Sequence, residues 1–246
     1  MIRTVLFDED GHTWYAFSRD PHRSPAVIDT NEYLVVSDGE GVAMDPGGTE
    51  IFPQVVSALA QVIPIENIKH FLASHQDPDV MSALPLWMGL TPKARVYMSW
   101  LWSGFIAHYG HEFVDRFVTI ADQGDVIRLG NGHLLQLVPA HYCHSSGNFS
   151  LYDPVARILF SGDIGAALLP EEHDSVYVRD VDSHIQYMAG FHRRWMPSNQ
   201  AKNEWVERVR KLDVQLLCPQ HGAIFKGTQV GEFLDWLEAL EVGVCN

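Results

Sequence analysis

The 246-residue sequence predicts an α/β protein in which two β-sheets pack face to face and helices lie outside them. Composition is the first reason, because 46% of the residues are apolar and 20% are charged, as in a packed globular core. The order of patterns is the second reason, because short apolar runs come first in turn-linked pairs and later alternate with helical stretches. The sequence contains no repeat and no linker, so we expect a single domain over residues 1–246.

The elements follow from the apolar periodicity along the chain. The helix over 49–62 is expected because Ile51, Val55 and Leu59 recur at helical spacing. The other helices are expected at Met98–Tyr109, Asn203–Lys211 and Val230–Leu240. The strands are expected at Val5–Phe7, Thr13–Phe17, Tyr33–Ser37, Gly41–Met44, Asn67–Ala73, Phe117–Ile120, Val126–Leu129, Leu134–Val138, Phe149–Tyr152, Ile158–Phe160 and Leu216–Cys218.

Charge and cysteine content exclude several classes of partner. Seventeen basic and 31 acidic residues give a formal net charge of −14, which repels nucleic acid and anionic lipid, so we expect neither as a partner. No apolar run is long enough to span a membrane, and the first residues do not form a secretory signal. The three cysteines, Cys143, Cys218 and Cys245, are too few and too scattered for a disulfide framework. We therefore expect a cytoplasmic protein.

Histidine and aspartate residues follow the ends of several predicted strands. His75, Asp163 and His221 each come just after an apolar strand, and His144 follows the strand that ends near Val138. Strand ends at one edge of a sheet can converge, and ligand-binding groups gather at such edges. The sequence therefore predicts a polar site built from four distant segments.

The segment Ser74-His75-Gln76-Asp77-Pro78-Asp79 offers three metal-ligand side chains at every second position. In an extended loop such side chains point the same way, although Asp and Pro also favour an ordinary polar turn. The segment resembles the metallo-β-lactamase superfamily motif H-x-H-x-D-H, with Asp77 at the second His position and Val80 at the last. A carboxylate at the second position resembles the flavodiiron branch, whose motif is H-x-E-x-D-H.

Four further segments resemble the remaining superfamily motifs, in the same order. Asp45-Pro46-Gly47-Gly48 resembles the first motif, although alone it reads as a strand-to-helix turn. Between His141 and His144, position in the third motif favours His144 as the ligand, and His141 is left to orient a ligand or cap a turn. The fourth and fifth motifs are Phe160-Ser161-Gly162-Asp163 and Cys218-Pro219-Gln220-His221-Gly222.

The resemblance implies a metallo-β-lactamase fold, an αβ/βα four-layer sandwich, with two metal ions. His75, Asp77 and His144 would hold the first ion, Asp79 and His221 the second, and Asp163 would bridge them, with Asp45 in support. Val80 cannot bind a metal. The second ion could then be more open or more weakly bound, or His184 could replace the missing ligand; we favour a surface role for His184.

The carboxylate-rich ligand set favours iron, with zinc or manganese as alternative occupants. The chain also closely resembles the stand-alone oxygen-binding diiron proteins, which implies two iron ions that can carry an oxo or peroxo bridge. No flavin-binding domain is expected, because only about 25 residues follow His221. O2 or NO would be the ligand, a separate electron donor or signalling protein the partner, and a homodimer the assembly.

Two classes of function remain open from the sequence. An oxygen or redox sensor, or a reductase with a separate electron donor, fits the open diiron site. The alternative is a dinuclear hydrolase of a lactone, ester or thioester, since many proteins with this fold activate water with two zinc ions. Asp77 and Val80 argue against the hydrolase because both replace zinc-binding imidazoles. A non-catalytic interaction module would not need six ligand residues.

Overall fold

The computed structural model describes residues 1–18, 28–170 and 172–244. Cys245 lies outside the described residues. The chain divides into two compact units, unit 1 over Met1–Leu134 and unit 2 over Leu135–Asn246. Whether the two units act as the single domain expected from the sequence stays a prediction.

Unit 1 contains a seven-stranded sheet in the order β1-β2-β3-β4-β5-β6-β7. The first four strands pair antiparallel, and β4 to β7 pair parallel. The strands of unit 1 are β1 (Ile2–Glu9), β2 (His12–Ser18), β3 (Glu32–Ser37), β4 (Glu40–Met44), β5 (Ile68–Leu72), β6 (Arg95–Ser99), β7 (Phe117–Ile120) and β8 (Asp125–Arg128). The parallel half places the carboxyl ends of β4 and β5 at one edge.

Two Asp-Gly pairs turn the antiparallel half of this sheet. Asp10 and Gly11 connect β1 to β2, and Asp38 and Gly39 connect β3 to β4. All four residues have positive φ, between 48° and 78°. Two consecutive residues with positive φ form the turn that matches the twist of paired strands, and Asp-Gly adopts it at low cost.

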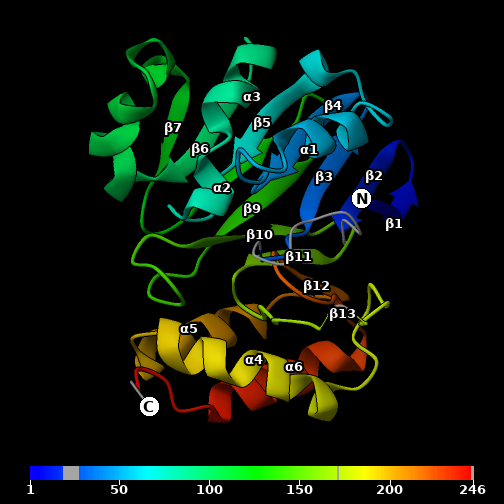
Figure 1. Ribbon diagram of the computed structural model, residues 1–246, viewed down its shortest axis with the longest axis vertical. Helices are drawn as coiled ribbons and strands as arrows, with labels where there is room; N and C mark the ends of the chain where they lie inside the picture. The colour runs from blue at the N-terminus through cyan, green and yellow to red at the C-terminus, as the bar shows by residue number, and fades with distance from the viewer. Residues whose placement is uncertain (19–27, 171, 245–246) are drawn as a thin grey trace. The chain divides into compact units, whose positions relative to one another are not determined.

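Helices α1 and α3 lie across one face of this sheet (Figure 1). The helical segments of unit 1 are α1 (Phe52–Leu59), η1 (Ile65–Asn67), α2 (Pro78–Met81), α3 (Leu84–Leu90), η2 (Trp100–Tyr109) and η3 (His111–Arg116). Trp87 of α3 packs between Phe52 and Phe71, with ring centroids 5.0 and 5.5 Å away. Its indole N–H donates to the carbonyl of Pro46 at 3.1 Å, which fixes the loop that follows β4.

The strands of unit 2 lie in the order β13-β12-β11-β10-β9. β11 and β12 pair parallel, and the other neighbours pair antiparallel. The elements of unit 2 are β9 (Leu134–Pro139), β10 (Phe149–Asp153), β11 (Ile158–Gly162), α4 (Val181–Trp195), α5 (Asn199–Val209), β12 (Leu216–Pro219), β13 (Phe225–Lys226) and α6 (Thr228–Ala239).

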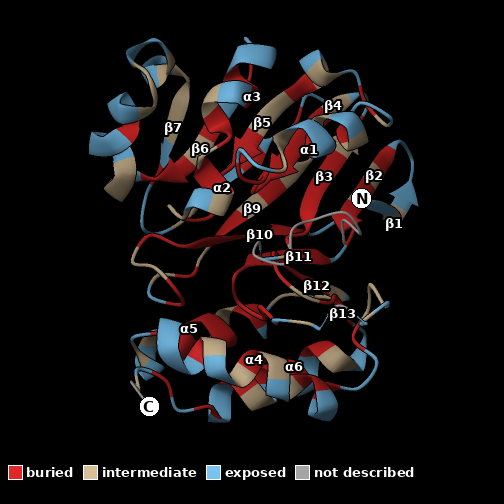
Figure 2. Cartoon of the chain, viewed as in Figure 1, coloured by how far each residue is buried: buried red, intermediate tan, exposed pale blue. Residues whose placement is uncertain are grey.

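The core of unit 2 forms between its sheet and its three helices. Strands β10 and β11 are buried along their whole length, whereas α4, α5 and α6 alternate buried and exposed residues (Figure 2). Trp205 of α5 is fully buried and donates its indole N–H to the hydroxyl of Ser150 at 3.2 Å. The rings of Phe225 and Phe233 pack in a tilted arrangement at 4.6 Å between centroids, which joins β13 to α6.

The structure differs from the predicted elements in several places. The helix expected over Met98–Tyr109 is wrong at its start, because Met98 belongs to β6 and a 3₁₀ helix begins only at Trp100. The 15-residue helix α4 was not predicted from the sequence, and neither were α2 and α3. Among the described residues, no helix combines the length and apolar character that crossing a membrane requires.

Candidate metal centre

The ligand residues expected from the sequence fall into two groups of three, one in each unit. We call His75, Asp77 and Asp79 the first ligand cluster; it belongs to unit 1. We call His144, Asp163 and His221 the second ligand cluster; it belongs to unit 2.

The first ligand cluster starts where β4 and β5 end. Met44 pairs with Leu72 in parallel register, so Asp45 and Ser74 emerge from the same edge of the sheet. One carboxylate oxygen of Asp45 accepts the backbone N–H of Ser74 at 2.7 Å, and the other accepts its hydroxyl at 2.5 Å. Asp45 therefore fixes both the backbone and the side chain of the residue before His75.

This arrangement sets the protonation of the His75 ring. The Ser74 hydroxyl lies 2.8 Å from Nδ1 of His75. Because that hydroxyl donates its hydrogen to Asp45, its oxygen accepts from Nδ1–H, which leaves the Nε2 lone pair for a metal. Nε2 lies 3.7 Å from a carboxylate oxygen of Asp77. A histidine that binds a metal through one ring nitrogen commonly has its other nitrogen held by a hydrogen bond, as the Ser74 hydroxyl holds Nδ1 here.

The chain is not extended through the whole of this cluster. Asp77 is extended, with φ −69° and ψ 155°, but the helical turn α2 begins at Pro78. The predicted extended loop is therefore wrong from Pro78 onward, and Asp79 lies in the first turn of a helix. Val80 is fully buried in the apolar core of unit 1, so the side chain at the last motif position packs with apolar neighbours.

The second ligand cluster forms at one edge of the sheet of unit 2. Because β11 and β12 run parallel, with Gly162 beside Pro219, Asp163 and His221 both emerge from this edge. Strand β10 runs antiparallel to β11, so the loop that carries His144 enters β10 at the same edge. The predicted convergence of these three strand ends is confirmed within unit 2.

Asp163 lies between the two histidines of this cluster. One of its carboxylate oxygens lies 3.5 Å from Nε2 of His144, and the other lies 3.4 Å from Nε2 of His221. All three residues are at least nine-tenths buried. Ligand atoms bound about 2.1 Å from one ion lie roughly 3.0–3.4 Å apart. The types of ligand atom, and the distances from Asp163 to His144 and His221, therefore fit a carboxylate that binds two metal ions, one through each oxygen.

Aromatic side chains of α4 surround the ring of His144. Phe191 stacks parallel to it at 5.8 Å between centroids, and Trp195 lies 5.0 Å away. His141, the competing histidine, instead packs edge-on against Phe149 at 5.1 Å. These contacts agree with the choice of His144 as the ligand, which stays a prediction.

Cys143 precedes His144 in the loop between β9 and β10 and is unsuited to a reactive role. Its thiol is buried and lies 3.6 Å from the carbonyl of Ala201. Burial raises the pKa of the thiol to about 12, so the protonated form dominates at neutral pH. Cys218 is buried as well, and burial also raises the pKa of its thiol. Both side chains therefore behave as small apolar groups of the core.

His184 is a buried residue of α4. The expectation of a surface position is wrong, because only 3% of the residue is exposed. Its ring packs edge-on against Phe225 and Tyr187, and the ring of His173 lies 6.4 Å away. Burial, aided by the nearby charge of His173, lowers the pKa of His184 to about 4. The folded protein therefore holds this imidazole in its neutral form at physiological pH.

The lowered pKa of His184 predicts a pH-dependent stability. An unfolded histidine takes up a proton near pH 6.5, whereas the folded one resists until about pH 4, so the unfolded state binds more protons between these values. The stabilisation is complete above about pH 6.5 and declines towards pH 4, by up to about 3 kcal/mol. Urea unfolding across this range should show a smaller decline for His184→Phe than for wild type. An equal decline in the two proteins would contradict the assignment.

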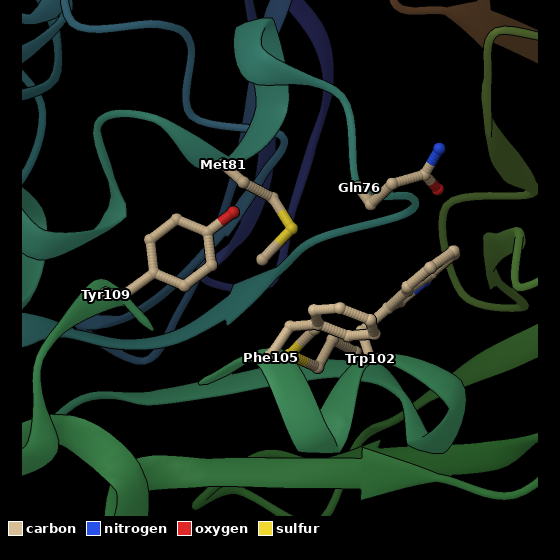
Figure 3. Close-up of a pocket in the computed structure, with 6 residues that line it drawn as sticks. Gln76, Met81, Trp102, Phe105 and Tyr109 are labelled. Carbon is tan, nitrogen blue, oxygen red and sulfur yellow. The ribbon is translucent and has the colours of Figure 1, made fainter. Parts of the chain in front are cut away.

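A cavity of about 280 Å³ lies in unit 1 beside the first ligand cluster. Gln76, which stands between His75 and Asp77 in the sequence, lines it and donates its side-chain amide to Asp77 at 3.0 Å. Figure 3 shows Gln76 and Met81 on the α2 side, with aromatic rings of η2 facing them. The remaining lining residues are Met98, Trp102, Phe105 and Tyr109. The walls are therefore mostly apolar, with few polar groups.

His192 is a residue near the site that sequence reasoning missed. No motif of the sequence includes it, yet it is fully buried and its Nε2 accepts the backbone N–H of Gly165, two residues after Asp163. The signal that could have found it is the spacing of Met188, His192 and Trp195, which places them on one side of a helix.

Comparison with protein families decides the relationship. A profile described as ODP family beta lactamase matches residues 28–222, which is most of the chain. The chain belongs to this family. Membership in the ODP family confirms the predicted α/β fold class of metallo-β-lactamase type and the resemblance to the flavodiiron-like branch.

Solved structures resemble this ODP-family chain over nearly its whole length. A peroxy diiron species of the chemotaxis sensor ODP is 41% identical and has a TM-score of 0.89, with 99% of this chain and 97% of that one covered. The apo state of the chemotaxis sensor ODP from T. denticola gives the same identity and TM-score, with 98% and 96% covered. A mutant flavo di-iron protein from Thermotoga maritima shares the fold at 21% identity and a TM-score of 0.79, over 96% of this chain and 60% of its own.

Curated sequences match over smaller shares of their length. Diflavin flavoprotein A 1 from Synechocystis sp. is 30% identical over 135 residues, which are 54% of this ODP-family chain and 23% of that protein. An uncharacterized protein from Methanocaldococcus jannaschii is 23% identical, over 92% of this chain and 58% of its own length. The chain thus spans between about a quarter and three fifths of these two relatives.

Proposed function

We propose that this chain is a non-haem diiron protein that binds O2, or a related diatomic gas such as NO. The proposed ligands of the two iron ions are His75, Asp77, Asp79, His144, Asp163 and His221. The observation that carries the proposal is the geometry of Asp163, whose two oxygens each face a different buried histidine. The proposal is also supported by the 41% identity to the chemotaxis sensor ODP, which has been solved as a peroxy diiron species.

The ligand types favour iron over zinc. The two ligand clusters together supply three carboxylates and three imidazoles, a harder and more anionic set than the imidazole-rich sites that zinc prefers. Asp77 takes a position that is a histidine in the zinc-binding pattern, and Val80 removes another imidazole. Two ferrous ions in this set would supply two electrons to O2. The chain itself would hold the ions, fix the ligand rings and leave a position open for the gas.

The surroundings of the first ligand cluster suit an apolar gas. The hydrogen bonds from Asp45 through Ser74 keep Nε2 of His75 available, and Gln76 holds Asp77 from the side of the cavity. Apolar walls favour a molecule that is itself weakly hydrated, as O2 and NO are. We infer that the cavity admits the gas next to the proposed site.

We favour a sensor over a rapid reductase. Reduction needs a continuing supply of electrons, which we assign to a separate donor protein, while sensing needs a partner that reads the gas-bound state. The similarity to a chemotaxis sensor supports the sensing role. We further propose a cytoplasmic location, where ferrous iron is available, and a homodimeric assembly.

Metal analysis of wild type and an Asp77→His variant tests the choice of metal. We expect anaerobically purified wild type to contain about two irons per chain, the number for a dinuclear site. With Fe2+ and Zn2+ supplied together, Asp77→His should take up more zinc, at least about 10-fold by the softness of imidazole. Asp77→Glu is the matched control, since it keeps the carboxylate. Unchanged iron selectivity in Asp77→His would count against the role given to the carboxylate.

A further inference from the structure

His192 makes two hydrogen bonds in the last turn of α4. Its Nε2 lies 2.9 Å from the backbone nitrogen of Gly165, and its Nδ1 lies 2.9 Å from the carbonyl oxygen of Met188. Because a backbone N–H can only donate, Nε2 accepts, and the ring hydrogen on Nδ1 is donated to Met188. The ring is fully buried, so these two bonds fix its orientation and its tautomer.

The bond to Gly165 holds the turn that carries Asp163. Three hydrogen bonds are internal to this turn: Ile164 N–H to the Ser161 carbonyl at 3.3 Å, the Ser161 hydroxyl to the Ile164 carbonyl at 2.6 Å, and Ala166 N–H to the Asp163 carbonyl at 3.1 Å. The N–H of Gly165 instead points out of the turn towards α4. Gly165 has φ +96°, a conformation that glycine adopts readily and few other residues do. Because a glycine backbone is the least restricted, the turn depends on contacts such as this hydrogen bond to keep its position.

The same helix also contacts the other loop of the second ligand cluster. Phe191 and Trp195, neighbours of His192 on α4, pack against the ring of His144. Helix α4 therefore contacts His144 through ring packing, and it contacts the turn that carries Asp163 through one directional hydrogen bond. Stacking sets the plane of a ring, whereas a hydrogen bond also sets where the bonded backbone lies.

We propose that His192 is a positioning residue for Asp163. By accepting the Gly165 N–H, it keeps the turn against α4, so that the two carboxylate oxygens stay directed at His144 and His221. The inference rests on the proposed function, because the placement of Asp163 is given the purpose of binding two metal ions. Replacing a group that hydrogen-bonds directly to a metal ligand commonly changes metal affinity about 10- to 100-fold, and His192 acts on Asp163 through the backbone of Gly165, two residues away.

Two substitutions separate the hydrogen bond from simple packing. His192→Phe keeps a ring of similar size but removes the acceptor, whereas His192→Gln offers a side-chain oxygen that can accept the Gly165 N–H. His184→Phe is the matched control, because it replaces another buried histidine of α4 that packs against other residues. Co2+ titration, followed by its visible absorption, measures affinity and ligand geometry. Amide exchange of Gly165, measured by NMR on metal-free protein, reads the hydrogen bond directly.

We expect His192→Phe to bind Co2+ about 10- to 100-fold more weakly, with an altered spectrum and faster exchange at Gly165. His192→Gln and His184→Phe should stay close to wild type in all three readings. Equal impairment of His192→Phe and His192→Gln would overturn the proposal, and so would wild-type behaviour of His192→Phe. If wild type failed to bind iron or O2, the proposed function would fall, whereas Gly165 exchange would still report on the role of His192.

Discussion

An Asp163→Asn variant is expected to lose most of its iron and to retain less than about one ion per chain, against about two in wild type. An amide has no charge, and its nitrogen is not a ligand, so only one oxygen remains where two faced separate histidines. His144 and His221 would then lack the anion they share. We expect apparent affinity for Fe2+ to fall by more than about 100-fold, beyond the effect typical of supporting residues.

The size match between the two residues makes this substitution informative. Asparagine fills nearly the same volume as aspartate, so circular dichroism should show a folded protein. Asp213→Asn is the control in unit 2, because Asp213 is exposed and pairs with Arg157 at the surface. Anaerobic equilibrium dialysis with Fe2+ measures the affinity of each protein. Two tightly held irons in Asp163→Asn would show that this carboxylate does not bridge the ions.

The second large effect is expected when the link from Asp45 to His75 is broken. Asp45 accepts two hydrogen bonds from Ser74, and the Ser74 hydroxyl accepts one from His75. In Asp45→Asn, one of the two accepting oxygens is replaced by an NH2 group, which cannot accept a hydrogen bond, so one of the two bonds from Ser74 is lost. The Ser74 hydroxyl is then free to reverse, and the His75 tautomer is no longer fixed. We expect metal affinity to fall about 10- to 100-fold.

A double-mutant cycle tests whether these residues act as one unit. Ser74→Ala removes the middle of the link, so adding Asp45→Asn to it should cost little more. Asp115→Asn, an exposed substitution in unit 1, is the control for the loss of one charge. The measurement is Fe2+ affinity of the two single variants, the double variant and the control. Strictly additive losses would mean that Asp45 acts on the site by another route.

Much of the second ligand cluster could be predicted because strand ends carry it. The apolar runs before Asp163 and His221 are buried and only four or five residues long, and their shortness together with the Gly or Pro at their ends favours strands over helices. Once both were strands of one sheet, parallel pairing placed their carboxyl ends together. The family resemblance then supplied the roles of the individual residues, which spacing alone could not.

The parts that could not be predicted depend on contacts distant in sequence. Two of the four buried residues of helix α4 are His184 and His192, at positions where apolar residues are usual, so apolar residues alone do not mark its buried face. His192 is accepted there because Gly165 and Met188 satisfy both ring nitrogens. The helical turn at Pro78 was missed because Asp and Pro suit a loop as well as a helix start.

The most direct test of the diiron account is an O2 titration of anaerobically purified, iron-loaded wild type, followed by visible absorption. The account predicts about two irons per chain and a new charge-transfer band that saturates near one O2 per pair of irons. Asp163→Asn, run in parallel, should give no such band. A protein that holds only zinc, shows no change with O2 and rapidly hydrolyses a lactone or thioester would contradict the account.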